Sequence, residues 1–281
     1  MEKFILSNGL AIPANGFGVY QVAPNIAKEV TKAALKEGYR LLDTAQAYGN
    51  EKEVGEAIRE SGVRREEIFL TTKVWVNHYG EGKTYESVLD SFDRLGVDYL
   101  DLILLHQPFG DVYGAYRDLE RLYKEGKVKS IGVSNFYPDR LVDLSLSMEI
   151  KPMVNQIEIN PFFQQEEAKK WNEKYGVLLE AWAPFGEGRL KMFENETLQK
   201  IGEKYSKSVA QVILRWLYQR GIVSLAKTVH ESRMKENQDI YSFELSKEDM
   251  ETISKMDKGD SLFLNHQDPS VVEGLRSFKV K

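Results

Sequence analysis

The 281-residue sequence predicts one (β/α)8 barrel, also called a TIM barrel, that spans residues 1–281 as a single domain. Short apolar runs alternate with amphipathic stretches along the whole chain, and eight such units of about 35 residues fill its length. No stretch rich in proline, glycine or serine marks a domain boundary. A doubly wound sheet is the alternative, but Gly16-Phe17-Gly18 is followed by Gln21 where the dinucleotide-binding turn of that fold needs a third glycine.

The chain begins with an expected β-hairpin, because apolar runs at 4–6 and 11–13 flank the turn residues Ser7, Asn8 and Gly9. Buried strands are then expected at residues 16–20, 40–43, 68–74, 100–106, 129–134, 153–157, 177–182 and 222–227. Helical periodicity predicts helices at residues 26–37, 51–61, 82–95, 113–125, 139–148, 166–175 and 198–220, with further helices near the C-terminus. Right-handed crossovers between parallel strands bring all the carboxyl ends of the strands to one end of the barrel.

Composition excludes several classes of protein. The sequence has no cysteine, which rules out a disulfide scaffold, thiolate-bound zinc, an iron–sulfur cluster and a cysteine nucleophile. With 38 basic and 43 acidic residues the net charge is -5, and no basic stripe is present, so no nucleic-acid partner is expected. The longest aliphatic run, at residues 102–105, is too short to cross a membrane. The N-terminal apolar run is not a secretory signal, so a cytoplasmic protein is expected.

Ionisable and amide side chains follow the predicted strands at regular intervals. Asp43, Lys73, His106 and Asn135 each stand at the end of an apolar run, and 30, 33 and 29 residues separate them; Gln156 follows the next run. One βα unit per step places these residues at the carboxyl ends of successive strands, where barrel active sites are built. A salt bridge at the barrel rim would explain Asp43 and Lys73 alone equally well, but the added imidazole and amides favour a reaction site.

A tyrosine lies near this group in the sequence. Tyr48 follows Asp43 by five residues, and a phenol with a pKa of about 10 is a poor acid at neutral pH. A neighbouring ammonium such as Lys73 stabilises the phenolate and lowers that pKa. These groups suit the protonation of an oxygen that gains negative charge. His78 and His266 fall in expected loops without partners at metal-ligand spacing, so neither a metal site nor a catalytic role is expected of them.

With these residues in place, the sequence resembles the aldo-keto reductase family along its whole length. The motifs that carry the resemblance follow the family's order and spacing: LDTAQAYGNE at 42–51, TTKVW at 71–75, DLILLHQP at 101–108, IGVSNF at 131–136 and NQI at 155–157. The chain resembles the bacterial diketogulonate-reductase-like or the prostaglandin-F-synthase-like branch. The resemblance implies a barrel whose N-terminal hairpin closes its bottom, and an oxidoreductase that uses NADP(H).

The resemblance also implies a role for each member of a catalytic tetrad. Tyr48 would be the general acid for carbonyl reduction and the base for alcohol oxidation. Lys73 would lower the pKa of Tyr48 and would itself be held by Asp43. His106 would orient the substrate oxygen and stabilise the charge that develops there. The hydride would come from the nicotinamide, without a covalent intermediate.

At the nicotinamide end of the cofactor, the resemblance implies contacts from strand ends and one loop. Ser134, Asn135 and Gln156 would hydrogen-bond the carboxamide and so fix which face of the ring presents its hydride. Trp182 would stack on the ring, although packing inside the barrel is a common alternative for such an aromatic residue. The loop Phe185-Gly186-Glu187-Gly188 would wrap the pyrophosphate through backbone amides.

At the adenosine end, the resemblance implies a clamp for the 2′-phosphate. Lys227, Thr228 and Arg233 would form this clamp, Asn237 would contact the adenine, and His230 would be a minor contact. Two cations and a hydroxyl suit a dianion, so NADPH is expected over NADH. Solvated charge at a helix end is the alternative interpretation of these residues.

The expected substrate pocket departs from the commoner family pattern. Tyr20, Trp75 and Gln107 should line it, and Gln107 and Tyr20 stand where tryptophan is frequent in the family. A more polar pocket favours small aldehydes, ketones, keto-acids and keto-sugars over steroids. A regulatory or structural barrel that binds cofactor with little turnover is the alternative function, and an isomerase is a weaker one. The expected partner is a small-molecule carbonyl substrate, and the protein is expected to be a monomer.

Overall fold

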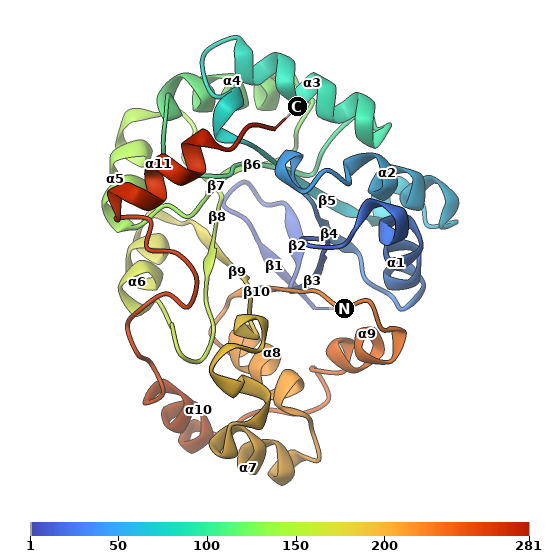
Figure 1. Cartoon of the computed structure of the whole chain (residues 1–281), viewed down its shortest axis with the longest axis vertical. Coiled ribbons are helices and arrows are strands. Elements are labelled where there is room, and N and C mark those ends of the chain that lie inside the picture. The colour runs from blue at the N-terminus through green and yellow to red at the C-terminus, as the bar shows by residue number, and fades with distance from the viewer. Residues whose placement is uncertain (1, 281) are drawn as a thin grey trace.

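Eight parallel strands close into a barrel in this chain, for which the computed structural model describes residues 2–280 (Figure 1). The strands follow one another around the barrel in chain order, and the last pairs with the first to complete the ring. Their bounds are β3 Asn15–Gly18, β4 Leu41–Asp43, β5 Phe69–Val74, β6 Leu102–Leu105, β7 Ile131–Ser134, β8 Val154–Glu158, β9 Leu178–Trp182 and β10 Val223–Ala226. The predicted (β/α)8 fold is confirmed, and every predicted strand end lies within two residues of the observed one.

The barrel strands are buried on both faces, which is why their sequences are apolar runs without alternation. All the residues of β5, β6 and β7 are buried. Strand β7 also needs a glycine at Gly132, because a Cβ there would lie 2.4 Å from the backbone oxygen of Val154 in β8. A side chain at position 132 would therefore push β7 and β8 apart.

Helices surround the barrel (Figure 1). Their bounds are α1 Pro24–Lys36, α2 Glu51–Glu60, α3 Lys83–Leu95, α4 Val112–Lys124, α5 Pro138–Ser147, α6 Glu166–Tyr175, α7 Glu196–Tyr205, α8 Val209–Gln219, α9 Glu231–Gln238, α10 Lys247–Ser254 and α11 Pro269–Ser277. Helices α1 to α10 bury apolar residues, whereas α11 buries none. In the part of the chain that the structure describes, four 3-10 helices lie in the loops: η1 Gln46–Tyr48, η2 Arg65–Glu67, η3 Val76–His78 and η4 Gly186–Glu194. Within residues 2–280, no helix combines the length and the apolar character needed to span a bilayer.

The N-terminal hairpin consists of β1 Lys3–Ile5 and β2 Ala11–Pro13, which pair antiparallel as expected. Its turn residue Asn8 donates a 2.9 Å hydrogen bond from Nδ2 to the backbone oxygen of Lys129, just before β7 begins. Phe4 stacks on Tyr218 with ring centroids 5.6 Å apart. The hairpin therefore covers the amino ends of the strands and leaves the opposite end of the barrel free for the site.

The prediction of one helix at residues 198–220 is wrong, because the structure has two helices there, α7 and α8. Ser206 adopts a left-handed conformation with φ of 55° and ends α7. Ser208 then begins α8 with a capping box, in which its hydroxyl and the Gln211 side chain each satisfy a backbone N–H. The helical period of apolar residues continues across the break, so periodicity alone does not reveal the break. The Ser-x-x-Gln spacing of Ser208 and Gln211 was nevertheless a usable signal for the start of a new helix.

The last residues of the chain lie at the carboxyl end of the barrel. Helix α11 crosses this end next to α5 (Figure 1). The segment after it reaches the residues that follow β5, where Trp75 Nε1 donates to the backbone oxygen of Phe278 at 2.9 Å. Asn77 and Val280 exchange two further hydrogen bonds of 3.0 and 3.1 Å. The C-terminal segment is therefore fixed against the site end of the barrel.

We expect Gly55→Ala to destabilise the fold. An added Cβ would lie 1.9 Å from the backbone oxygen of Leu95, so helices α2 and α3 would have to separate. Overpacking of this kind costs about 1–3 kcal/mol of unfolding free energy, which chemical denaturation can measure. Gly274→Ala in α11 is the matched control, because its Cβ meets nothing within 4 Å and helix propensity favours alanine by about 1 kcal/mol. Equal stability of the two variants would contradict this account of the α2–α3 contact.

Candidate active site

Consecutive strands deliver the predicted residues to one end of the barrel. Asp43 is the last residue of β4, Lys73 lies near the end of β5, His106 directly follows β6, and Ser134 is the last residue of β7. All four are buried. Because neighbouring parallel strands hold these residues at similar levels, their side chains meet in one site, as the sequence spacing indicated.

The ammonium group of Lys73 lies at the centre of this site. Nζ donates to Asp43 Oδ1 at 2.5 Å, to the backbone oxygen of Thr44 at 3.1 Å and to Tyr48 Oη at 3.0 Å. An ammonium has three hydrogens, so each one has a partner. Burial opposes the charge, but Asp43 and Tyr48 outweigh burial, and the pKa of Lys73 is raised. Lys73 is therefore a permanent cation in contact with the phenol oxygen.

The phenol of Tyr48 is protonated at neutral pH and can donate into the site. Burial raises the pKa of Tyr48 to about 12, Lys73 acts in the opposite direction, and Asp43 adds to the rise. Lys73 lowers the pKa of Tyr48 as the sequence predicted, but burial, which that prediction left out, has the larger effect, and the net pKa lies above its usual value. Since Tyr48 Oη accepts a hydrogen bond from Lys73, its own hydrogen is free for another acceptor.

The loop that carries Tyr48 is held rigidly by one buried amide. Asn50 donates from Nδ2 to the backbone oxygens of Val19 and Val22, at 3.0 and 3.1 Å. Its Oδ1 accepts a 2.9 Å hydrogen bond from the hydroxyl of Thr44. These contacts join the loop after β4 to the loop after β3, so the position of the phenol is set by the backbone around it.

His106 faces the phenol as a neutral imidazole. Its ring meets those of Tyr48 and Trp75 edge to face, with centroids 5.7 and 5.0 Å apart. Burial, with smaller contributions from Lys73 and His266, holds the pKa of His106 well below its usual value. Its Nδ1 is buried and has no hydrogen-bond partner among the described residues, which leaves Nε2 as the nitrogen available to a bound molecule.

Ser134 and Gln156 lie side by side, because they pair in register between β7 and β8. The Ser134 hydroxyl donates to the backbone oxygen of Gln156 at 2.8 Å. The Gln156 amide nitrogen donates to Asp43 Oδ2 and to Glu180 Oε2, both at 2.9 Å. Glu180 was not predicted from the sequence, since a single carboxylate inside the apolar run of β9 has no spacing pattern that relates it to the other residues.

Asn135 and Trp182 form the neighbouring part of the site. Asn135 adopts φ of 64° and donates from Nδ2 to the backbone oxygen of His106 at 3.1 Å. Its Oδ1 accepts a 3.0 Å hydrogen bond from Trp182 Nε1. The indole is half-buried and meets Phe263 edge to face at 5.3 Å, a contact that the sequence did not suggest. Both polar ends of the Asn135 amide are therefore fixed.

The loop after β9 has the unusual backbone that the glycines indicated. Gly186, Glu187 and Gly188 all have left-handed φ, of 53°, 51° and 75°. Phe185 anchors the loop by packing on Phe193, with ring centroids 5.5 Å apart. Successive backbone N–H groups in such conformations can form a concave site for an anion.

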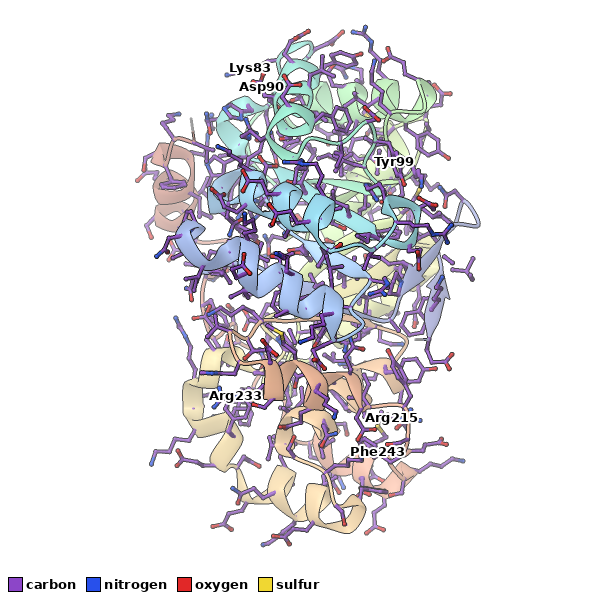
Figure 2. The ribbon with its side chains drawn as sticks, turned by 90° about the vertical axis from the view of Figure 1, so that its right-hand side faces the viewer. Lys83, Asp90, Tyr99, Arg215, Arg233 and Phe243 are labelled. Atoms are coloured by element: carbon purple, nitrogen blue, oxygen red, sulfur yellow. The ribbon has the colours of Figure 1, made fainter. Side chains whose placement is uncertain are left out.

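The predicted 2′-phosphate clamp lies where β10 leads into α9. Lys227 directly follows β10 and is exposed, while Thr228 is buried and its hydroxyl accepts from the backbone of His230 at 3.1 Å. Arg233 lies on the outer surface of α9 (Figure 2), and Asn237 is buried on the same helix. Within residues 2–280, neither Lys227 nor Arg233 makes an ion pair. Both cations are thus available to a phosphate group. This arrangement fits a nucleotide whose ribose carries a 2′-phosphate.

The predicted pocket residues surround the phenol and the imidazole. The ring of Tyr20 lies 5.1 Å from that of Tyr48, and more than half of its surface is exposed. Trp75 is buried and is covered by Phe278, which meets it edge to face at 5.6 Å. Gln107 is buried, and its Oε1 has no partner among the described residues. No sequence pattern relates Phe278 to the pocket, because 203 residues separate it from Trp75.

A cavity of about 510 Å³ lies beside Asn135, between the loops after β6 and β7 and the C-terminal segment. His266 lines it, stacked on Phe109 and edge to face with Tyr137. Burial lowers the pKa of His266 to about 4. His78 ends η3, the short 3-10 helix in the loop between β5 and α3. No group of three or more His, Asp or Glu side chains in residues 2–280 has an arrangement that could hold a metal ion.

Comparisons with known proteins agree with this geometry. A family model described as the aldo/keto reductase family matches residues 14–258. A glyoxal reductase of Bacillus subtilis is 49% identical over 257 residues, which cover 91% of this chain and 92% of that protein. Methylglyoxal reductase DkgA of Escherichia coli is 37% identical over 260 residues, or 92% and 94% of the two chains. The crystal structure of a Bombyx mori aldo-keto reductase in complex with NADP superposes with a TM-score of 0.90 at 29% identity, covering 97% of this chain and 96% of that one.

We expect Lys73→Met to lower the stability of the protein strongly. The substitution leaves the Asp43 carboxylate buried without its cation, which costs about 3–5 kcal/mol of unfolding free energy in comparable buried pairs. Lys124→Met is the matched control, since Lys124 and Glu149 form an exposed pair at 2.6 Å that should contribute little to stability. Denaturation of both variants measures the difference, and a Lys73 variant as stable as the control would show that the buried pair does not support the fold.

Proposed function

Because the chain belongs to the aldo/keto reductase family, we propose that it reduces small α-dicarbonyl compounds and related aldehydes with Tyr48 as the general acid. The protein is an NADP(H)-dependent oxidoreductase that acts on carbonyl groups. One observation carries the assignment of Tyr48: its oxygen accepts a 3.0 Å hydrogen bond from Lys73, so its own proton remains for the substrate oxygen.

Each member of the tetrad then has a separate role in protonating the substrate. NADPH, when bound, supplies the hydride. Tyr48 gives its proton to the carbonyl oxygen as negative charge develops there, and Lys73 stabilises the phenolate that remains. Asp43 keeps Lys73 in place and charged. His106, as a neutral donor, hydrogen-bonds the same substrate oxygen and orients it. In alcohol oxidation the phenolate accepts the proton.

The cofactor contacts are also part of the proposal. Ser134, Asn135 and Gln156 hold the carboxamide, and Trp182 offers a half-buried aromatic face to the nicotinamide ring. The support for this arrangement is that these residues lie at one end of the barrel and that hydrogen bonds join Trp182 to Asn135, Asn135 to Ser134 and Ser134 to the backbone of Gln156. The remaining proposed contacts follow the cofactor outwards: Phe185, Gly186, Glu187, Lys227, Thr228, Arg233 and Asn237.

Small, polar substrates fit the pocket better than large apolar ones. Tyr20, Trp75 and Gln107 bound the space above the phenol, and Gln107 contributes an amide where the family often has tryptophan. The C-terminal segment narrows the pocket further by covering Trp75. Relatives named glyoxal reductase and methylglyoxal reductase act on carbonyl compounds of this size.

We also propose that the protein works as a single-domain monomer in the cytoplasm. One chain supplies every member of the tetrad and every proposed cofactor contact, so the site needs no second copy. Sedimentation of the purified chain measures the oligomeric state.

A substrate panel tests the proposed activity. We expect steady loss of NADPH absorbance with glyoxal, methylglyoxal and small aldehydes, and at least about tenfold lower kcat/KM for a steroid ketone that the narrow pocket cannot seat. Keto-acids and keto-sugars complete the panel. Cofactor binding without turnover on any carbonyl compound would instead indicate a regulatory or structural barrel.

We expect Tyr48→Phe to abolish reduction while NADPH affinity stays nearly unchanged. The ring remains and preserves packing, but the transferable proton is lost, which costs about 10²–10⁴-fold in kcat. Tyr113→Phe is the matched control, because the Tyr113 hydroxyl donates to Asp143 at the surface and has no part in the proposed site. Near-normal turnover by the Tyr48 variant would contradict the assignment of Tyr48 as the general acid.

We expect Arg233→Ala to weaken NADPH binding by about tenfold or more and to leave NADH binding nearly untouched. A charge-assisted hydrogen bond contributes roughly 1.5–3 kcal/mol before screening, so added salt should reduce the difference. Glu236, a nearby carboxylate, accepts from Ser208 and does not pair with Arg233. Lys235→Ala, an exposed cation on the same helix, is the control. Equal losses for both cofactors in the Arg233 variant would contradict the clamp.

A further inference from the structure

The side chain of Gln156 lies between two carboxyl groups inside the barrel. Its Nε2 donates to Asp43 Oδ2 and to Glu180 Oε2, at 2.9 Å each. An amide nitrogen has two hydrogens, so each carboxyl group takes one of them. Turning the amide over would place its oxygen against the Asp43 carboxylate, which can only accept. Gln156 is therefore held in one of its two amide orientations.

Glu180 is placed to do this by the strand register. It pairs with Gln156 between β9 and β8, and its side chain has no exposed surface. Burial, with the negative charge of Asp43, raises the pKa of Glu180 to about 8, while Lys73 acts in the opposite direction. The carboxyl group thus carries a proton at neutral pH, and its carbonyl oxygen still accepts from Gln156. Its other oxygen, Oε1, has no partner among the described residues. Among those residues, Gln156 therefore has the one side chain that hydrogen-bonds to Glu180.

The oxygen of Gln156 is left free by this arrangement. Within residues 2–280, its Oε1 accepts no hydrogen bond, although it lies beside Ser134 at the end of the barrel that is proposed to hold the nicotinamide. The amide of Asn135 is also fixed, by the indole N–H of Trp182. The carboxamide of nicotinamide offers both a C=O acceptor and N–H donors, and a fixed amide oxygen selects the N–H end.

We propose that Glu180 is a positioning residue of the cofactor site, which holds the Gln156 oxygen toward the N–H group of the nicotinamide carboxamide. The inference rests on the proposed NADP(H) site and extends it by one buried residue that does not touch the cofactor. Without Glu180, one hydrogen of the Gln156 amide loses its acceptor, and the side chain can rotate away from the position in which its oxygen meets the carboxamide. The loss should then concern only ligands that have an amide hydrogen.

A pair of nucleotides and a pair of variants test this proposal. NADP⁺ has the carboxamide, whereas its 3-acetylpyridine analogue keeps the C=O group and replaces the NH₂ group by a methyl group. Binding of both to the full chain is followed by quenching of tryptophan fluorescence. Glu180→Met removes the acceptor, and Glu180→Gln keeps one at nearly the same place. Glu180→Leu is a second variant without an acceptor, should the methionine variant fail to fold.

We expect Glu180→Met to weaken NADP⁺ binding by about three- to tenfold, the range for one neutral hydrogen bond, and to change binding of the analogue by less than about twofold. Glu180→Gln should bind both nucleotides like the wild type. Equal losses for both nucleotides would show a merely structural role and overturn the proposal, and so would unchanged NADP⁺ binding. Failure of the wild type to bind NADP⁺ would overturn the proposed function itself, and the inference with it.

Discussion

A positive charge inside the barrel is the constraint on which the site depends. The ammonium of Lys73 has no exposed surface, and a charge removed from water is tolerated only when its hydrogen bonds are complete. Each of its three hydrogens therefore fixes a partner: the carboxylate of Asp43, the backbone of Thr44 and the phenol of Tyr48. The phenol of Tyr48 is thus oriented by the hydrogen bond that its oxygen accepts from Lys73. The hydrogen of the phenol takes no part in this bond and can be donated to another acceptor.

The same carboxylate connects the two halves of the site. Asp43 accepts from Lys73 through one oxygen and from Gln156 through the other, so the proposed proton-transfer group and the proposed nicotinamide contact share one buried anion. These groups stand on barrel strands, and sites on strands hold their geometry better than sites on loops. The substrate side is different, because Tyr20, Gln107 and the C-terminal segment come from loops and the chain end. The proposed proton-transfer groups are therefore held mainly by the barrel strands, while the proposed pocket residues lie on the loops at its rim.

Much of this arrangement could be predicted from the sequence, because one βα unit separates Asp43 from Lys73 and Lys73 from His106. In a barrel, residues spaced in this way lie at the ends of neighbouring strands and therefore close together. The net pKa shift of Tyr48 could not, since burial depends on packing that the local sequence does not describe. The break at Ser206 was missed because the apolar period runs through it. Phe278 lies 203 residues from Trp75, and only the folded chain brings them together.

The C-terminal segment is held by hydrogen bonds to its backbone and by the ring of Phe278, which packs on Trp75. Trp75 Nε1 donates to the carbonyl of Phe278, and Asn77 binds both the carbonyl and the N–H of Val280. Every residue except proline offers the same backbone groups. Substitution of the side chains in this segment can therefore leave these hydrogen bonds in place. A barrel built in this way can acquire a new pocket wall by substitution at its C-terminal end, without disturbing the buried charges beneath.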